Sequence, residues 1–217
     1  MIQLLGLLGI SWLLIWLFEK GNLSVLGFIP TKDRLKYFII LFITSSMLSA
    51  TAFLLRIYFA QEEYEVSQSL TPKSILLETW YQFRTVLTEE LLCRGALLYI
   101  LIKKIGQTKA IIISSIIFAV LHWINSGVWG NLTQMIIVFT FTFSILVPFA
   151  IHYGWNLTQN YIFPDTTTGN HILTLAAPPP TVTISYLAFF TMLLLPKISV
   201  LLIDYLIIKR HRQVEVP

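Results

Sequence analysis

The stretch Thr-Val-Leu-Thr-Glu-Glu-Leu-Leu-Cys-Arg-Gly-Ala-Leu-Leu-Tyr-Ile-Leu-Ile, residues 85–102, places three charges inside an otherwise apolar run. In a helix, Glu90 and Arg94 are one turn apart and share a face, so they can form an ion pair. Glu89 is turned about 100° away from Glu90 and can face something else. A charge at the centre of a bilayer costs about 2.5–3.5 kcal/mol on insertion scales. We therefore expect these charges to face a protein interior or a wet cavity, around which the chain folds.

Composition places this stretch in a membrane protein. The chain has 217 residues, of which 56% are hydrophobic and 12% are charged, whereas soluble domains carry about 25% charged residues. Several apolar runs approach the roughly 20 residues that span a bilayer as a helix. The sequence predicts an all-α, polytopic transmembrane helical bundle. We expect a single integral-membrane domain over residues 1–217, with its motif-bearing core at about 75–163.

The apolar runs predict about seven spans, with six to eight allowed because the 132–163 region can be divided in two ways. Residues 151–163 are too short to cross a bilayer alone, and Pro148 predicts a break before them. Residues 1–18 are expected to form an anchor helix and not a cleaved signal peptide. The predicted apolar segments are 1–18, 37–60, 85–102, 110–123, 132–150, 151–163 and 181–208.

Charged loops orient these spans. The segments 19–36, 103–109 and 209–212 are basic and are expected on the cytoplasmic side, whereas the acidic segment 61–71 is expected outside. An interfacial helix is predicted over 72–84, leading into the third span, and a polar loop over 164–180. The formal net charge of +4 indicates membrane orientation and does not indicate nucleic-acid binding.

Two further apolar segments carry polar side chains at helical spacing. His122 follows Phe118 by four residues, and Asn156 follows His152 by four residues. Each pair therefore shares one face of its helix. Together with the glutamates, three separate helices present polar groups of a kind that hydrolases use.

Each of these features has an ordinary structural explanation when it is taken alone. Glu90 and Arg94 can simply tie helices together, and His122 can be an interfacial residue. His152 and Asn156 can form a hydrogen bond between helices. Cys93, the only cysteine, is expected to be a small packing residue. The structural explanation must nevertheless invoke three coincidences, so the combination favours a catalytic site.

The three segments resemble the motifs of a known family in order and spacing. Residues 89–95, Glu-Glu-Leu-Leu-Cys-Arg-Gly, are similar to its Glu-Glu-x-x-x-Arg motif. Residues 118–122, Phe-Ala-Val-Leu-His, match Phe-x-x-x-His, and residues 152–156, His-Tyr-Gly-Trp-Asn, match His-x-x-x-Asn. The chain thus resembles the CAAX-protease and bacteriocin-processing family of intramembrane glutamate proteases, also called the abortive-infection family. Its best-known member is the type II CAAX prenyl endopeptidase.

The resemblance implies a role for each motif residue. Glu89 would be the general base, and His122 would position and activate the attacking water. His152 and Asn156 would stabilise the oxyanion, each such donor being worth about 3 kcal/mol. The remaining members, Glu90 and Arg94, would form a supporting ion pair.

A zinc site is the alternative mechanism. Glu89, His122 and His152 could bind Zn²⁺ as two histidines and one carboxylate. No His-Glu-x-x-His spacing is present, however. We therefore favour a mechanism without a metal or other cofactor.

Three functions are compatible with the pattern. The first is an endopeptidase that cleaves membrane-associated or lipidated proteins and peptides in the bilayer. The second is a membrane scaffold or chaperone that keeps the fold without proteolysis. The third is a proton-coupled transporter, since intramembrane glutamate and histidine also serve as proton relays; the absence of repeated halves argues against it. We expect a multi-pass protein of a bacterial inner or plasma membrane.

Overall fold

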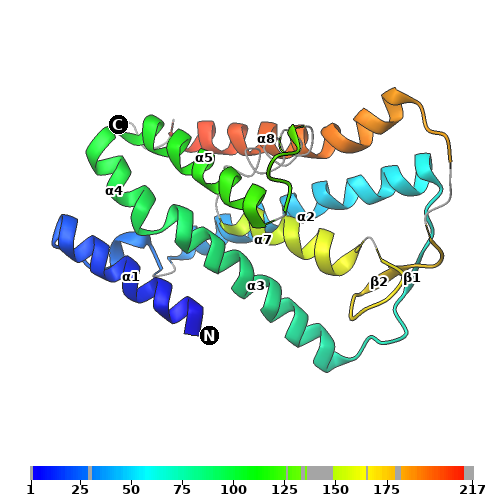
Figure 1. The fold of residues 1–217 in the computed structure, drawn as a ribbon, viewed down its shortest axis with the longest axis horizontal. Coiled ribbons are helices and arrows are strands. Elements are labelled where there is room, and N and C mark those ends of the chain that lie inside the picture. Colours follow the sequence, from blue (N-terminus) through cyan, green and yellow to red (C-terminus); the bar gives the residue numbers. More distant parts are fainter. Residues whose placement is uncertain are drawn as a thin grey trace. The chain divides into compact units, whose positions relative to one another are not determined.

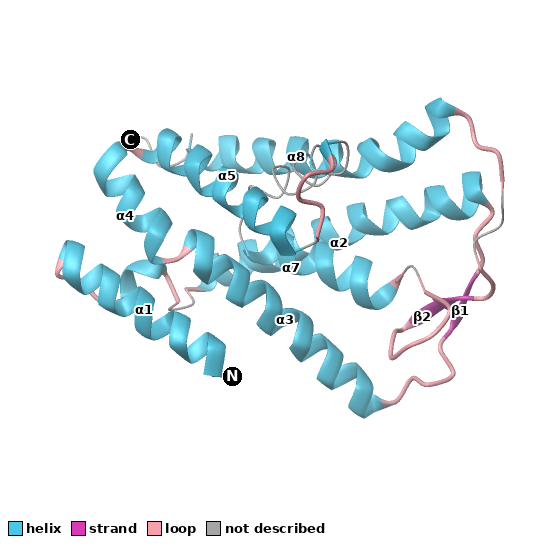
Figure 2. Cartoon of the chain, in the orientation of Figure 1, coloured by secondary structure: helices cyan, strands magenta, loops and turns pink. Residues whose placement is uncertain are grey.

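The computed structural model describes residues 2–28, 31–125, 127–132, 135, 149–164, 166–178 and 182–212. The chain is mostly helical, as Figures 1 and 2 show. Its elements, in order, are α1 (Ile2–Glu19), η1 (Leu23–Leu26), α2 (Lys32–Ala60), β1 (Tyr64–Val66), α3 (Pro72–Arg94), α4 (Ala96–Ile105), α5 (Gln107–Asn125), α7 (Phe149–Leu157), η2 (Thr158–Ile162), β2 (Leu173–Leu175) and α8 (Tyr186–Arg212).

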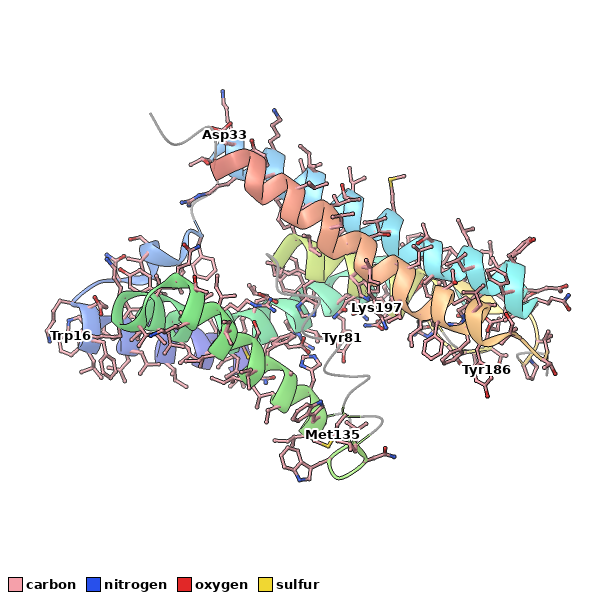
Figure 3. The ribbon with its side chains drawn as sticks, turned by 90° about the horizontal axis from the view of Figure 1, so that it is seen from above. Trp16, Asp33, Tyr81, Met135, Tyr186 and Lys197 are labelled. Carbon is pink, nitrogen blue, oxygen red and sulfur yellow. The ribbon has the colours of Figure 1, made fainter. Side chains whose placement is uncertain are left out.

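Among the described residues, three helices are long and apolar enough to cross a membrane. They comprise residues Ile2–Glu19, Lys32–Ala60 and Gln107–Ile124. Many large apolar side chains point outward from the helices, Tyr186 of α8 among them (Figure 3). Lipid tails can cover such a surface, because they are as apolar as the side chains themselves. The protein is therefore an integral membrane protein, while the number of spans stays a prediction.

Contacts within the chain define two compact units. The first contains Met1–Lys36 and Arg84–Phe149, and the second contains Tyr37–Phe83 and Ala150–Pro217. Glu89 and His122 thus belong to the first unit, and His152 and Asn156 belong to the second. Each unit is described by itself below.

In the first unit, α4 packs against both α5 and α1. Lys104, near the end of α4, lies with its Nζ atom 3.8 Å from a carboxylate oxygen of Glu19 at the end of α1. The segments 19–36 and 103–109, both predicted to be cytoplasmic, are therefore at the same end of this unit.

In the second unit, a short two-stranded sheet includes the segment that follows α2. Strand β1 pairs with β2 in an antiparallel two-stranded sheet, with Tyr64 opposite Leu175. Arg56 of α2 forms an ion pair with Glu62, and the two atoms Nε and Oε2 are 2.9 Å apart. The sheet joins two segments that the sequence predicts as plain loops, 61–71 and 164–180, because strand pairing satisfies their backbone groups.

The third apolar segment differs from its prediction. A single span over 85–102 is expected from its apolar run, but α3 ends at Arg94 and α4 begins at Ala96. The predicted interfacial helix over 72–84 is the first half of α3, without a break. Hydropathy cannot locate this bend, because both sides of it are apolar.

Gly95 is the residue at the bend, and a close backbone approach requires it. A Cβ atom at this position would overlap the carbonyl oxygen of Leu91. Glycine has no Cβ, so the chain can turn there without moving Leu91. The bend directly follows Arg94 and therefore affects the placement of the charged residues on α3.

Replacing Gly95 with alanine is expected to destabilise the protein by about 1–3 kcal/mol, the usual cost of overpacking. The measurement is the midpoint of thermal unfolding in detergent. Gly9→Ala is the matched control, because in the described part of the chain nothing beyond the backbone of α1 itself and its chain neighbours lies within 4 Å of a Cβ at Gly9. Equal midpoints for the two variants would contradict the assigned role of Gly95.

Other sequence predictions are close to the observed bounds. The first, second and fourth apolar segments correspond to α1, α2 and α5. The last segment corresponds to α8, but the break predicted at Pro196 is wrong, because α8 continues through this residue as one helix. Most of the predicted span 132–150, including the expected break at Pro148, lies outside the described residues.

Candidate active site

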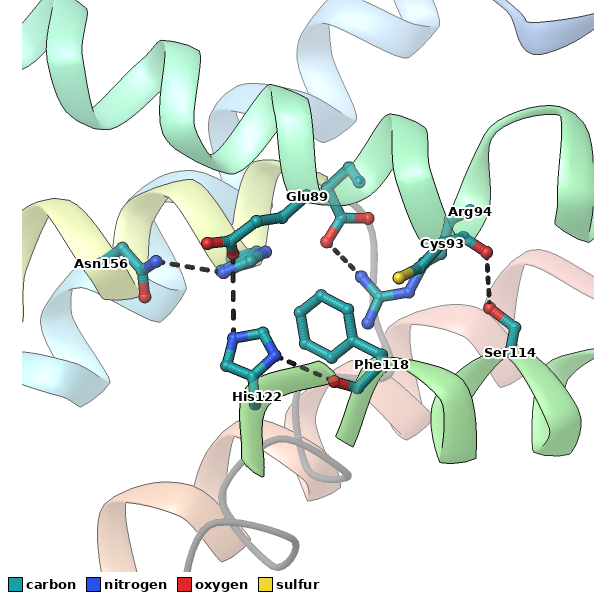
Figure 4. Close-up of polar contacts among 9 residues, drawn as sticks. Glu89, Cys93, Arg94, Ser114, Phe118, His122 and Asn156 are labelled. Carbon is teal, nitrogen blue, oxygen red and sulfur yellow. Dashed lines mark hydrogen bonds and ion pairs between the residues drawn. The ribbon is translucent and has the colours of Figure 1, made fainter. Parts of the chain in front are cut away.

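Glu89 of α3 and His122 of α5 face each other in the first unit (Figure 4). The Oε2 atom of Glu89 lies 3.9 Å from Nε2 of His122. This distance exceeds that of a hydrogen bond, but one water molecule can bridge two polar groups at such a separation. About a quarter of each side chain is exposed, 28% for Glu89 and 25% for His122. The described part of the chain therefore encloses neither side chain completely, although the Oε2 atom of Glu89 that faces His122 is itself buried.

The other ring nitrogen of His122 fixes the tautomer of the neutral imidazole. Nδ1 of His122 lies 2.9 Å from the carbonyl oxygen of Phe118, one turn earlier in α5. A carbonyl oxygen can only accept, so Nδ1 carries the proton and donates it. In the neutral ring, Nε2 then presents a lone pair toward Glu89. Such a lone pair can accept a hydrogen bond from a water held by the carboxylate.

The second glutamate has a different environment. Glu90 forms an ion pair with Arg94 one turn later in α3. Only 9% of the Glu90 side chain and 12% of the Arg94 side chain are exposed. The neighbouring glutamates therefore differ, since Glu90 is buried with a partner cation while Glu89 is partly accessible.

An aromatic ring connects this ion pair to the histidine. The guanidinium carbon of Arg94 lies 4.7 Å from the ring centroid of Phe118. The Phe118 and His122 ring centroids are 4.3 Å apart. A cation over an aromatic face is stabilised by the ring quadrupole. Arg94 thus contacts both Glu90 and the ring that supports His122.

A further hydrogen bond joins α3 to α5. The hydroxyl of Ser114 donates to the carbonyl oxygen of Cys93 over 2.9 Å. This bond holds the end of α3, next to Arg94, against α5. The Cys93 side chain is only 1% exposed, as expected for a small packing residue.

The second unit contains the other predicted pair. His152 and Asn156 lie one turn apart on α7. The Asn156 amide nitrogen lies 3.0 Å from Nε2 of His152 (Figure 4). The amide donates and Nε2 accepts, so the imidazole proton is on Nδ1. An amide nitrogen carries two hydrogens, and the second can be offered to another acceptor.

The structure thus brings the predicted residues together in two groups. Glu89, Glu90, Arg94 and His122 form one group in the first unit, and His152 and Asn156 form the other in the second. The convergence of both groups on one polar cavity stays a prediction, because each group is described within its own unit. In the described part of the chain, no group of three or more His, Cys, Asp or Glu side chains is arranged to hold a metal ion.

Two contacts at the candidate site are not predicted from the sequence. Phe118 was noticed for its spacing to His122, yet its contact with Arg94 was not predicted. The hydrogen bond from the Ser114 hydroxyl to the Cys93 carbonyl is likewise not predicted from the sequence. Arg94 and Phe118 are 24 residues apart, so no periodic pattern could have indicated their contact.

The fold and this site define a class, a helical integral membrane protein with a paired carboxylate and histidine on neighbouring helices. Residues 71–158, which contain all three motifs, match the family described as "Type II CAAX prenyl endopeptidase Rce1-like". No curated protein and no solved structure matches the chain. The region that carries the motifs is thus similar to a family of endopeptidases.

Proposed function

We propose that the protein is a metal-independent intramembrane endopeptidase in which Glu89 activates a water molecule. The observation that supports this function best is the pairing of Glu89 with His122 at 3.9 Å, with both side chains partly exposed. A carboxylate and an imidazole at this separation can hold one water between them. A purely structural ion pair would be expected closer and more buried, as Glu90 and Arg94 are.

In the proposed reaction, the bound water loses one proton to the Glu89 carboxylate. The resulting hydroxide forms a bond to the carbonyl carbon of the scissile peptide, and a tetrahedral oxyanion results. The carbon–nitrogen bond then breaks, and the proton held by Glu89 passes to the leaving amine. General acid–base catalysis of this kind contributes about 10²–10⁴-fold to a rate.

His122 accepts a hydrogen bond from the attacking water at Nε2 in this scheme. Its orientation is maintained by the bond from Nδ1 to the Phe118 carbonyl. The ring contact with Phe118 supports the same orientation. His122 therefore directs the water lone pair rather than accepting its proton.

His152 and Asn156 would stabilise the oxyanion. Asn156 donates one N–H to His152, which leaves the second amide hydrogen for the developing negative charge. Removal of one oxyanion donor typically costs about 10²–10³-fold in kcat. This role requires the two groups of residues to converge around the same substrate carbonyl.

The substrate is proposed to be a protein or peptide that is already associated with the bilayer. An intramembrane site can be reached by a membrane-anchored or lipidated segment without prior extraction from lipid. The matched family is described as a prenyl endopeptidase, which supports lipidated C-terminal segments as a first substrate class. No nucleic-acid partner is proposed.

Oxygen-isotope labelling tests the proposed reaction. The purified protein, reconstituted in lipid nanodiscs, is incubated with membrane-anchored peptides in H₂¹⁸O. Hydrolysis is expected to place one ¹⁸O atom in the new carboxylate of the product, detected by mass spectrometry. A scaffold or transporter would give no labelled product, and Glu89→Gln protein controls for contaminating proteases.

Metal removal should leave the activity unchanged. Glu89 and His122 are proposed to act directly on water, so incubation with EDTA or 1,10-phenanthroline is expected to reduce the initial rate less than twofold. The control is a zinc protease assayed in the same nanodisc buffer. Loss of activity on chelation, with recovery on adding Zn²⁺, would establish the zinc alternative instead.

A further inference from the structure

Three serines of α2 donate hydrogen bonds to the backbone of α7. Ser45 Oγ lies 2.9 Å from the carbonyl oxygen of Ile151, and Ser46 Oγ lies 3.2 Å from that of Gly154. Ser49 Oγ lies 3.5 Å from the carbonyl oxygen of Trp155. We call Ser45, Ser46 and Ser49 the serine clamp. All of these residues belong to the second unit, so the clamp lies within one compact body.

The two helices approach each other closely at Gly154. A Cβ atom on Gly154 would overlap Ser45 Oγ and the carbonyl oxygen of Phe42. Small residues allow such backbone contact between membrane helices. The space around Gly154 therefore fixes which face of α7 lies against α2.

This contact face is opposite His152 and Asn156, the pair proposed to stabilise the oxyanion. Gly154 is two residues from both His152 and Asn156, which places it about 160° around the helix from each of them. Packing Gly154 against α2 consequently directs His152 and Asn156 away from α2. A rotation of α7 would move both side chains together.

Two aromatic contacts of Tyr153 also hold α7 against rotation. The ring of Tyr153 lies 5.2 Å from that of Phe42 and 5.6 Å from that of Phe83, measured between centroids. The hydroxyl of Thr158 donates to the Gly154 carbonyl oxygen over 2.9 Å. The Gly154 carbonyl thus accepts bonds from both Ser46 and Thr158.

We propose that the serine clamp is a set of positioning residues that fixes the rotation of α7 and so aims the His152–Asn156 pair. This inference rests on the proposed function for its catalytic consequence. It also gives a specific role to α2, whose residues lie outside the segment matched to the family. Alanine at the clamp positions keeps the close approach and removes only the hydroxyl bonds.

The first test compares kinetic constants. The Ser45→Ala/Ser46→Ala/Ser49→Ala variant is expected to show about tenfold lower kcat with unchanged KM, because small misplacements of reacting groups cost rate. Ser45→Ala alone is expected to show a smaller loss in the same direction. Thr51→Ala is the matched control. The Thr51 hydroxyl donates its hydrogen bond to the Leu48 carbonyl oxygen within α2 and not to α7.

A double-mutant cycle separates positioning from general destabilisation. If the clamp acts through the oxyanion pair, the clamp substitutions are expected to have no further effect on kcat in an Asn156→Ala background. A clamp effect of the same size in both backgrounds would overturn the proposal.

The second test does not depend on activity. In protein labelled with ¹⁵N-histidine, the Nε2 resonance of His152 reports its hydrogen bond from Asn156, and a His152→Gln variant assigns it. The clamp variant is expected to shift or split this resonance, while Thr51→Ala leaves it in place. An unchanged resonance in the clamp variant overturns the proposal. A shifted resonance in a protein that lacks hydrolysis would reject the protease function and retain the clamp.

Discussion

Glu89→Gln protein is expected to retain its fold and to lose about 10³-fold or more of its hydrolytic kcat, within the range for loss of a general base. Glutamine is nearly isosteric with glutamate and keeps a polar group 3.9 Å from His122. It cannot accept a proton from water at neutral pH. The measurement is kcat with a membrane-anchored peptide in nanodiscs, together with the thermal midpoint of each variant.

Two matched variants sharpen this result. Glu89→Asp keeps the carboxylate but shortens it by one methylene, so we expect a partial loss from misplacement of the base. Glu90→Gln changes the adjacent residue, which is paired with Arg94; it should reduce stability more than Glu89→Gln does. Full activity of Glu89→Gln protein would exclude Glu89 as the base. The same inactive variant can retain bound substrates for identification by mass spectrometry.

Arg94→Met is expected to cause the largest loss of stability among single substitutions at the site. It removes the cation that pairs with the buried Glu90 carboxylate and the contact with the Phe118 ring. Breaking a buried ion pair by removing one partner costs about 3–5 kcal/mol. For a chain of this size such a loss corresponds to a decrease of about 10 °C in the thermal midpoint.

The double variant Glu90→Leu/Arg94→Met tests the cause of this loss. Removing both charges leaves no unpaired buried carboxylate, so more than half of the lost stability is expected to return. Lys104→Met is the control for an exposed pair. Lys104 is 59% exposed beside Glu19, and its ion pair is expected to contribute about 1 kcal/mol or less. If Lys104→Met matches the effect of Arg94→Met, burial does not explain the role of Arg94.

The Glu89–His122 pair, which we propose to be catalytic, and the Glu90–Arg94 ion pair differ in exposure, and the proposed chemistry depends on this difference. Glu89 and His122 are each about a quarter exposed, whereas Glu90 and Arg94 are close to fully buried. A base must exchange protons with water, while a buried ion pair must exclude water to remain strong. Two adjacent glutamates can meet both requirements because successive helical residues point in directions about 100° apart.

Much of the local structure could be predicted from the sequence. The apolar runs correctly predicted α1, α2 and α5, because helix length and hydropathy are local properties. The four-residue spacing of Glu90 with Arg94 correctly predicted an ion pair within α3. The same spacing of His152 with Asn156 correctly predicted a shared helix face, but the hydrogen bond between these two side chains was not predicted. The bend at Gly95 and the pairing of β1 with β2 could not be predicted in the same way. Each depends on backbone contacts that residue type alone does not reveal.

The sequence by itself determined that this is a helical membrane protein with three polar motifs, since insertion energetics and the 3.6-residue period act over short stretches of chain. Only the tertiary structure decided that Glu89 meets His122, that Phe118 connects Arg94 to His122, and that serines of α2 hold α7. Ser45 and Ile151 are 106 residues apart in the chain. Contacts of this kind depend on how helices pack against one another, and helix periodicity specifies only the faces available for packing.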